Sequence, residues 1–345
     1  MAVGTKDSHV QTRVLTVETA ELFQSAVREA VALLRAGEVV AVPTETVYGL
    51  AANALNGEAV QRIYTAKGRP AHNPVIVHVA SLEMARQCVA RWSDEAERLA
   101  REFWPGPLTL VLPRANTIPD VVTAGGGTVG VRLPLHPFIR KVIEQCGFPL
   151  AAPSANPANQ ISPTTAEHVS EGLAGRIPLI IDAGPTSVGI ESTVLDLSSE
   201  DVRILRPGMI SARQIGKVLS RAISAGTNDS VQLRSPGLLQ KHYSPRARLI
   251  VTSWKDETEL GDFVRSTGVK PEAAHVIAYD CIPQINPFGR VAIIPHDEDA
   301  YARALYAELH RSDQLGASLI IVERPPSGAE WDGIHDRLKR ASAVS

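Results

Sequence analysis

Residues 20–43 read AELFQSAVREAVALLRAGEVVAVP, a helix pattern followed by a strand pattern. Apolar side chains recur at helical spacing through the first part, and Gly37 is a residue type that commonly ends a helix. The segment Glu38–Val42 is typical of a strand, which Pro43 closes. Similar alternation continues to about residue 222. It indicates an α/β fold in which helices flank a twisted mixed sheet.

The same criteria predict further elements along this first part of the chain. Helices are expected at 58–66, within 82–103 (one or two), at 138–146 and at 210–222, and strands at 75–79, 108–112, 129–133, 150–152, 179–181, 193–197 and 202–205.

The composition changes near residue 223, where the sequence SAGTNDS lacks periodicity and indicates a linker. A second alternation then predicts a small, mostly parallel, Rossmann-like α/β domain. We therefore predict a larger domain over 15–222, a linker over 223–247 and a C-terminal domain over 248–345. The expected C-terminal strands lie near 249–254, 275–279, 290–294 and 318–322, and the helices near 256–266, 298–312 and 330–341.

The composition is that of an ordinary globular protein. The chain has 345 residues, of which 44% are hydrophobic and 21% charged, and its net charge is -2. No overall positive field draws it to nucleic acid. Three widely spaced cysteines without a Cys-x-x-Cys motif argue against a zinc knuckle or a disulfide framework. The polar first residues and the lack of a long apolar run lead us to expect a cytoplasmic protein without membrane contact.

Residues 67–73 read KGRPAHN and follow a short helix pattern. Lys67 and Arg69 sit two apart in a Gly/Pro turn, which we expect to display rather than bury them. A movable ammonium group and a planar guanidinium suit a polyanion such as a triphosphate. A solvated surface turn is the alternative interpretation.

Residues 125–130, GGGTVG, match a Gly-x-Gly-x-x-Gly pattern, but a strand pattern follows where a dinucleotide site needs a helix. We reject that motif, and the chain also lacks a P-loop. The glycines are expected to form a turn from which Thr128 approaches a ligand.

Two polar loops follow in the sequence. Ser154 lies at the carboxyl end of the predicted strand 150–152, where ligands gather in open α/β sheets. It lacks a Gly-x-Ser-x-Gly elbow, so we interpret it as a hydrogen-bond donor to phosphate or sugar; a turn or helix-cap serine is the alternative. The loop Ser162–Thr165 leads into a helix expected near Glu167, and helix entrances can hold anions.

Several charged or titratable residues lie in or beside predicted strands. Arg132 lies within an apolar strand and needs a partner, either a substrate carboxylate or an internal Asp or Glu. Arg206 lies at a strand end, and Glu191–Thr193 opens another strand. For His78 in VIVHV, a hydrogen-bonded core histidine is the default interpretation.

Taken in order, these segments resemble the L-threonylcarbamoyladenylate synthases, a family with a YrdC-like sheet, in their two-domain form. The resemblance covers about residues 20–220 and rests on Pro43–Leu50, Lys67–Pro70 with Asn73 and Pro74, Trp104–Thr109, Thr128–Arg132, Pro153–Asn156, Glu191–Thr193 and Arg206–Gly208. Ser235–Gly237 and His242–Pro245 resemble the linker of that form, although residues 238–241 depart from the expected Met- and Tyr-containing pattern.

The resemblance implies a nucleotidyltransferase that joins L-threonine, bicarbonate and ATP into threonylcarbamoyl-AMP and pyrophosphate. Mg²⁺ would arrive through the ATP phosphates, without a protein metal site. The product would pass to a tRNA threonylcarbamoyl transferase complex that modifies N6 of adenosine 37, and a weak RNA contact is a further expectation.

The resemblance also implies residue roles. Lys67 and Arg69 would be catalytic, and the linker would close over the site as a lid. ATP would contact Arg69, Asn73, Thr128, Ser154, Ser162, Arg206 and Tyr243. L-Threonine would contact Thr46, His78, Arg132, the backbone at Ala152, and Ser192.

Two other functions fit the sequence less well. A carbamoyl-adenylate-forming enzyme of the hydrogenase-maturation type would add zinc-binding cysteine pairs, which this chain lacks. An RNA-binding regulator would gather Lys67, Arg69, Arg132 and Arg206 into a local basic concavity, despite the slightly acidic balance. A purely structural role fits least, because so many polar groups occupy loops at strand ends.

Overall fold

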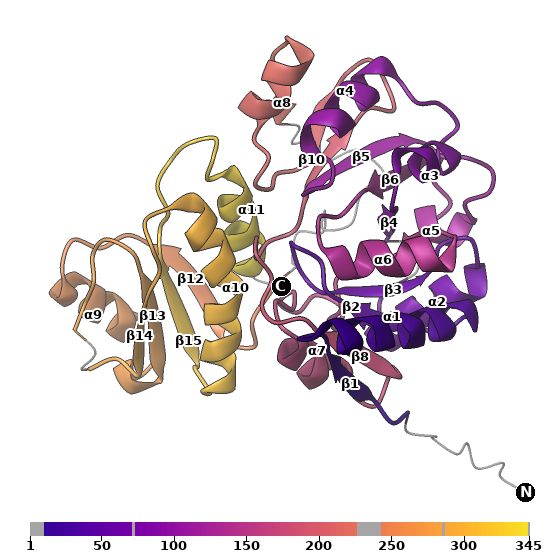
Figure 1. The fold of residues 1–345 in the computed structure, drawn as a ribbon. Coiled ribbons are helices and arrows are strands. Elements are labelled where there is room, and N and C mark those ends of the chain that lie inside the picture. The colour runs from indigo at the N-terminus through magenta and orange to yellow at the C-terminus, as the bar shows by residue number, and fades with distance from the viewer. Residues whose placement is uncertain (1–9, 71–72, 226–242, 285–286, 344–345) are drawn as a thin grey trace, which may run out of the picture.

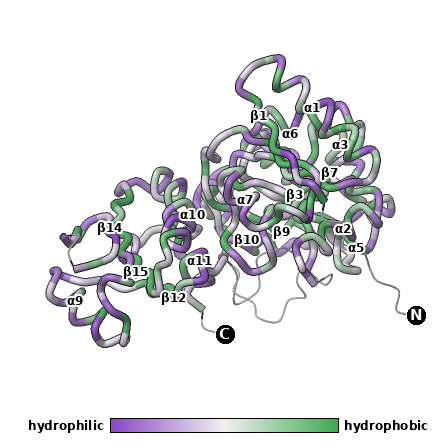
Figure 2. Tube along the Cα trace, turned by 90° about the horizontal axis from the view of Figure 1, so that it is seen from below, coloured by the Kyte–Doolittle hydropathy of each residue, from purple (hydrophilic) through white to green (hydrophobic). Residues whose placement is uncertain are grey.

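The computed structural model describes residues 10–70, 73–225, 243–284 and 287–343. They form two sheets, each with its own helices (Figure 1). Along the described chain the apolar stretches run mainly through the interior of both parts, and the polar stretches through the outer loops (Figure 2).

The larger sheet has the strand order β1-β8-β2-β3-β7-β4-β6-β5-β9-β10-β11. Parallel pairs such as β4 with β6 and β5 with β9 mix with antiparallel pairs such as β3 with β7 and β5 with β6. The predicted mixed sheet is therefore confirmed. Its strands are β1 Arg13–Thr16, β2 Val40–Val42, β3 Gly49–Asn53, β4 Val77–His78, β5 Leu108–Pro113, β6 Thr128–Arg132, β7 Leu150–Ala151, β8 Leu179–Asp182, β9 Thr193–Asp196, β10 Arg203–Arg206 and β11 Ser224–Ala225.

Helices flank this sheet, as the sequence predicts. The first of them begins where the Thr19 side chain accepts a hydrogen bond from Leu22 N at 3.2 Å, and Gly37 follows its end with φ +82°. The helices of this part are α1 Ala20–Arg35, α2 Gly57–Lys67, α3 Leu82–Gln87, α4 Asp94–Phe103, α5 Asp120–Thr123, α6 Pro137–Cys146, α7 Ala166–Leu173 and α8 Ala212–Leu219.

The C-terminal sheet has the order β12-β15-β13-β14, and all of its neighbouring strands are parallel. Figure 1 shows α10 and α11 on the side that faces the larger sheet and α9 on the far side. This confirms a small parallel α/β unit. Its elements are β12 Arg248–Thr252, α9 Glu257–Ser266, the 3-10 helix Pro271–Ala273, β13 Ala274–Ala278, β14 Arg290–Ile293, α10 Glu298–Gln314, β15 Leu319–Glu323 and α11 Asp332–Ala341.

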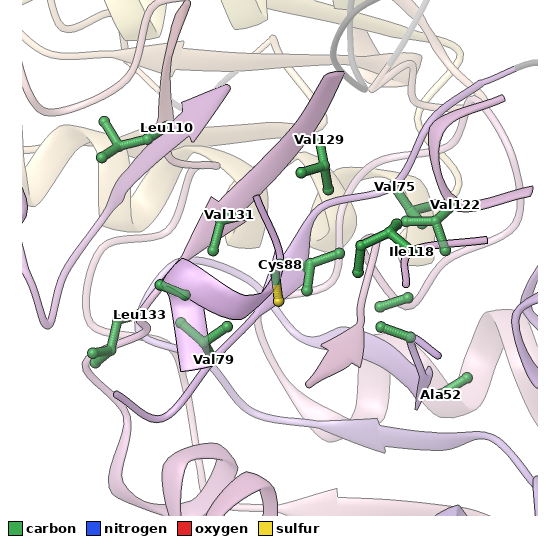
Figure 3. Close-up of a cluster of buried hydrophobic side chains, with 14 of the residues drawn as sticks. Ala52, Val75, Val79, Cys88, Leu110, Ile118, Val122, Val129, Val131 and Leu133 are labelled. Atoms are coloured by element: carbon green, nitrogen blue, oxygen red, sulfur yellow. The ribbon is translucent and has the colours of Figure 1, made fainter. Parts of the chain in front are cut away.

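Two apolar clusters hold the larger sheet against its helices, one with α2, α4, α7 and α8 and the other with α1 and α6. Figure 3 shows Cys88 among valine and isoleucine side chains, including Val129 and Val131, in the first of these clusters. Burying a side chain of this size stabilises the fold by about 1.5–3 kcal/mol. Ile215 and Leu219 of α8 belong to the same cluster, so this helix packs with the larger sheet.

The sequence prediction missed a few short elements. The strand β3 reads GLAAN, and Gly, Ala and Asn are depleted in strands, so tertiary pairing with β2 and β7 decides its conformation. The strand β11 pairs with β10 inside the range predicted as a linker without structure. Residues 226–242 of that linker, with Ser235–Gly237 and His242, lie outside the described residues. The predicted domain boundaries stay predictions.

Among the described residues, no helix combines the length and apolarity needed to cross a bilayer.

Candidate functional site

A cavity with about 480 Å³ of empty volume lies at the ends of the central strands of the larger sheet. Loops beside β3, β4, β6, β7, β9 and β10 supply most of its wall, because these strands are neighbours or near neighbours in the sheet. Its lining residues are Thr44, Thr46, Val47, Gly49, Arg69, Ile76, His78, Arg132, Ala152, Pro153, Ser154, Glu191, Ser192, Arg206 and Tyr243.

Arg132 enters the cavity from the last residue of β6, and its guanidinium has several protein partners. Nη2 lies 2.7 Å from Glu45 Oε1, Nη1 donates to Thr46 Oγ1 at 3.0 Å, and Nε donates to the Gly106 carbonyl at 3.1 Å. Both members of the ion pair are buried. The internal acid that the sequence left open as an alternative partner is therefore Glu45, and the guanidinium is held in one orientation.

His78 lies beside Arg132, because β4 and β6 are parallel and pair these two residues. Burial, reinforced by the Arg132 charge, lowers the pKa of His78 to about 3, so its ring is neutral near pH 7. Among the described residues, Nδ1 has no hydrogen-bond partner. The ring also has a backbone hydrogen-bond interaction with Ile76, as expected of a buried core histidine, while Nδ1 is available to a ligand.

The turn after α2 buries its two cations, and the expectation that it displays them is wrong. Gly68 ends the helix in the left-handed conformation, with φ +60°, and this turns the chain back toward the sheet. Arg69 is only 8% exposed, and its Nη2 donates to the carbonyls of Asn73 and Pro74 at 3.3 and 3.0 Å. Burial lowers the pKa of Arg69 to about 10, which still leaves it charged near neutral pH.

Lys67 lies behind the cavity wall. Its Nζ donates to the carbonyls of Ser154 and Asn156 and, at 3.1 Å, to Asn156 Oδ1. Burial and the neighbouring Arg69 charge lower its pKa well below the ordinary value, while three oxygen acceptors favour the ammonium form. Lys67 thereby fastens the loop that carries Ser154 to the end of α2.

Arg206 lies at the end of β10 and joins two sides of the cavity. Its Nε and Nη2 donate to the Ser192 carbonyl at 3.1 and 3.0 Å, and Nη2 also reaches Ser192 Oγ at 3.1 Å. Ser192 Oγ lies 2.8 Å from Thr109 Oγ1. Arg206 is also hydrogen bonded to Tyr243, the residue with which the described chain resumes. Hydroxyl groups and a guanidinium thus converge at one end of the cavity.

Glu191 is a buried carboxylate in the same wall. Its Oε1 accepts from Ser162 Oγ at 2.5 Å, and its Oε2 accepts from Arg337 Nε at 2.5 Å. Burial alone would raise its pKa, but Arg337 and Arg206 together lower it to about 2. Glu191 is therefore ionised across the physiological range.

Comparison with known proteins places this cavity in a family context. A family model described as "Telomere recombination", which covers the Sua5, YciO and YrdC proteins, matches residues 32–208. A second one, described as the C-terminal domain of threonylcarbamoyl-AMP synthase, matches residues 210–343. The chain is 40% identical to a threonylcarbamoyl-AMP synthase of Pyrococcus abyssi, over 92% of this chain and 94% of that protein. The chain belongs to the threonylcarbamoyl-AMP synthase family.

Other members of the threonylcarbamoyl-AMP synthase family are similar to this chain in sequence and in structure. The protein of that name from Bacillus subtilis is 40% identical over 92% of each chain. Crystallised P. abyssi Sua5 in complex with L-threonine superposes with a TM-score of 0.85 at 37% identity, covering 96% of this chain and 97% of that one. A double variant of P. abyssi Sua5 gives a TM-score of 0.87, with 96% of each chain covered. The two-domain architecture is therefore that of Sua5.

The cavity brings together nine of the thirteen residues that the synthase resemblance singled out. All five residues predicted for threonine line it, and so do Arg69, Ser154, Arg206 and Tyr243 from the nucleotide set. Their ligand contacts stay predictions. The nine lining residues are Thr46, Arg69, His78, Arg132, Ala152, Ser154, Ser192, Arg206 and Tyr243.

Four predicted synthase residues do not line this cavity. Lys67 and Ser162 lie behind its wall and hydrogen bond to residues of it. Asn73 is buried beside Arg69, and its Oδ1 has no hydrogen-bond partner among the described residues. Thr128 lines a neighbouring pocket of about 240 Å³, which shares Ile76 with the main cavity.

Sequence reasoning noticed Glu45 and Glu191 only as members of motifs and assigned them no role. A signal was present, because each is an acid adjacent to hydroxyl residues, in TET and EST, beside a predicted strand. Arg337 gave no signal of this kind, since a single arginine in a helix pattern is usually solvated.

Proposed function

We propose that this protein is an L-threonylcarbamoyladenylate synthase, a nucleotidyltransferase that makes threonylcarbamoyl-AMP and pyrophosphate from L-threonine, bicarbonate and ATP. The observation that carries the proposal is that Arg69, Arg132 and Arg206, from three distant parts of the sequence, line one cavity. Each is almost fully buried. Buried guanidinium groups that face a common space suit a ligand with several negative charges.

The threonine subsite of the proposal is the end with Arg132, Thr46 and His78. Thr46 Oγ1 already accepts from Arg132, so an arriving carboxylate would find a fixed guanidinium beside a hydroxyl. The neutral His78 ring can hydrogen bond to a hydroxyl group without adding charge. A site that hydrogen bonds to a substrate hydroxyl rejects an analogue without it far better than an apolar pocket does. The P. abyssi relative has been crystallised with L-threonine.

The nucleotide subsite of the proposal is the end with Arg69, Ser154 and Arg206. Arg69 Nε has no hydrogen-bond partner among the described residues, so it can donate to a phosphate oxygen. Ser154 is partly exposed at the end of β7, where its hydroxyl can reach the ligand. Tyr243 borders this end and could cover the base or ribose.

The chemistry needs positioning and charge compensation more than a covalent enzyme intermediate. The threonine amine attacks carbon dioxide or bicarbonate to give an N-carboxylate, and with bicarbonate the extra oxygen leaves in water. The N-carboxylate then attacks the α-phosphorus, a new P–O bond forms, and the bond to pyrophosphate breaks. Because two anions must approach each other, fixed guanidinium groups lower the cost of their repulsion.

Mg²⁺ fits this proposal as a companion of ATP. Among the described residues no group of three or more His, Cys, Asp or Glu side chains could hold a metal ion. The carboxylates nearest the cavity are already paired, Glu45 with Arg132 and Glu191 with Arg337. The residues therefore suit a metal held mainly by the phosphates, whose charge it would offset.

The wider role follows from the family. We propose that the product passes to a tRNA threonylcarbamoyl transferase complex, which modifies adenosine 37 of tRNA. The lid expected of the linker falls mostly on residues 226–242, which lie outside the described residues. A weak contact with RNA remains part of the proposal. All three cysteines are free, which agrees with a reducing compartment such as the cytoplasm.

The alternative of an RNA-binding regulator is not favoured. It would require Lys67, Arg69, Arg132 and Arg206 to present their charges together in a basic concavity, but all four side chains are buried. A cavity lined by buried guanidinium groups fits a small anionic ligand better than a nucleic acid backbone.

The test is pyrophosphate release by the full-length protein with Mg²⁺, omitting L-threonine, bicarbonate or ATP in turn. We expect release only when all three are present, and threonylcarbamoyl-AMP as the accompanying product by mass spectrometry. Release that is unaffected by threonine would contradict the proposed reaction. Replacing threonine by valine checks the hydroxyl requirement, and we expect little turnover with valine.

A further inference from the structure

Figure 1 shows α10 and α11 on the side of the C-terminal sheet that faces the larger sheet. Two glycines allow the backbones to touch. A Cβ atom at Gly189 would lie 2.5 Å from the Ala302 carbonyl oxygen of α10. A Cβ at Gly333 of α11 would lie 2.9 Å from Gly208 Cα. Such distances are below van der Waals contact, so the two parts are docked without room for further side chains at these points.

This docking places Arg337 of α11 next to the cavity. Its side chain is fully buried, and it is the largest side chain so buried among the described residues. Nε donates to Glu191 Oε2 at 2.5 Å, and Nη2 donates to the Glu191 carbonyl at 3.3 Å. Nη1 lies 2.6 Å from Asp336 Oδ2. An arginine of the C-terminal part thus meets a lining residue of the cavity through two hydrogen bonds.

Other groups of the C-terminal part surround the same carboxylate. Tyr306 of α10 donates to Glu191 Oε2 at 3.2 Å. His310, one turn further along α10, lies with Nε2 3.1 Å from the carbonyl of Ser162, whose hydroxyl donates to Glu191 Oε1. The Tyr243 ring lies 5.2 Å from the Arg337 guanidinium and 5.9 Å from the Tyr306 ring. Within the described part of the chain, Arg337 and Tyr306 of the C-terminal part and Ser162 of the larger part thus donate to the Glu191 carboxylate.

We propose that Arg337 is a positioning residue for the nucleotide subsite, acting through Glu191. Arg337 compensates the Glu191 charge and holds its carboxylate toward α10 and α11. Glu191 and Arg206 line the same cavity, and Arg206 donates to the carbonyl of Ser192, the residue that follows Glu191, so the carboxylate lies in the electrostatic field of this guanidinium. If Arg337 is absent, the uncompensated carboxylate competes with the ATP phosphates for Arg206 and repels them. The C-terminal domain thus tunes ATP affinity without touching ATP.

This inference rests on the proposed function, and its test separates the two. The full-length wild type, Arg337→Gln, Glu191→Gln and the double variant Arg337→Gln/Glu191→Gln are compared by pyrophosphate release at varied ATP and at varied threonine. Arg311→Gln, an exposed arginine on α10, is the matched control. A wild type without threonine-dependent release would overturn the proposed function. An active wild type leaves the variants to decide the role of Arg337.

We expect Arg337→Gln to raise KM for ATP by about tenfold or more, from the unscreened carboxylate near the phosphates, and KM for threonine by less than about threefold. Because Arg337 acts through the Glu191 charge, the double variant should recover most of the ATP affinity. Arg337→Lys keeps the charge and should recover part of it. The control should match the wild type.

A purely structural Arg337 gives a different pattern. In that case the KM for ATP of the double variant is as high as that of Arg337→Gln or higher, and Arg337→Lys does not lower the KM toward the wild-type value. Either result, or an unchanged KM for ATP in Arg337→Gln, overturns the inference. If Arg337→Gln fails to fold, the double variant alone tests the inference, because it removes both buried charges together and is expected to fold. Its KM for ATP must then lie within about threefold of the wild-type value.

Discussion

Replacing Lys67 by Met should damage both the fold and the activity, because the ammonium group supports the loop that carries Ser154. The substitution keeps the length of the side chain and removes its three protons. The carbonyls of Ser154 and Asn156 and the Asn156 Oδ1 then lose a buried donor. Met also removes a buried charge, whose desolvation is costly, and this offsets part of the loss.

The magnitude follows from the three acceptors. A buried acceptor left without a partner costs about 1–3 kcal/mol, and the low end is appropriate because the burial cost of the ammonium disappears. We therefore expect a loss of about 3 kcal/mol in the free energy of unfolding, or about 4 °C in Tm for a chain of 345 residues. A shift of about 1 Å in the Ser154 loop should lower kcat/KM for ATP by about a hundredfold.

The assay combines urea denaturation, followed by circular dichroism, with pyrophosphate release at varied ATP. Lys141→Met is the matched control, because Lys141 is 43% exposed and pairs with Glu144 on the surface at 3.2 Å. Its loss should cost less than about 1 kcal/mol and leave turnover unchanged. If Lys67→Met unfolds at the wild-type urea concentration and turns over normally, the assigned anchoring role is wrong.

Three further predictions concern the cavity and the docked domain. Arg132→Leu should raise KM for threonine by about a hundredfold because the threonine carboxylate loses its guanidinium partner, and should destabilise the protein by about 3–5 kcal/mol because Glu45 keeps an unpaired charge. Adding Glu45→Leu should restore the urea midpoint but not threonine affinity, and a normal KM in either variant would contradict the subsite. Folding lowers the pKa of Glu191 from 4.5 to about 2, which stabilises the protein above pH 4.5 by about 3 kcal/mol, and this contribution is lost as pH falls toward 2. The free energy of unfolding should therefore fall less steeply with decreasing pH in Glu191→Gln than in the wild type, and an equal slope would refute the shift. Gly333→Ala should lower Tm, because the added Cβ would lie 2.9 Å from backbone atoms of Gly208, whereas Gly127→Ala should leave Tm unchanged, because no atom lies within 4 Å of its added Cβ. Equal Tm values for the two variants would argue against tight docking.

The alternation of helices and strands could be predicted from the sequence because it depends on local periodicity. Amphipathic segments such as α1 and apolar runs such as β5 can be recognised from a few residues of sequence. The strand β3, which contains Gly, Ala and Asn, cannot be recognised in this way, because its pairing with neighbouring strands decides its conformation.

The site was predictable to the extent that its residues belong to contiguous motifs. Arg69, Arg132 and Arg206 stand in short segments with recognisable turns, so the family resemblance could point to each of them. Burial was not predictable, since a Gly/Pro turn can face either water or a sheet, and the turn at Lys67 faces the sheet. Arg337 could not be found at all, because its meaning depends on a partner 146 residues away in the sequence.

The most direct test is a crystal structure of the full-length protein with L-threonine and a non-hydrolysable ATP analogue. We predict that both ligands lie in the single cavity, with the threonine carboxylate at Arg132 and the phosphates between Arg69 and Arg206. A nucleotide bound elsewhere, or a threonine that contacts none of Arg132, Thr46 and His78, would contradict this prediction.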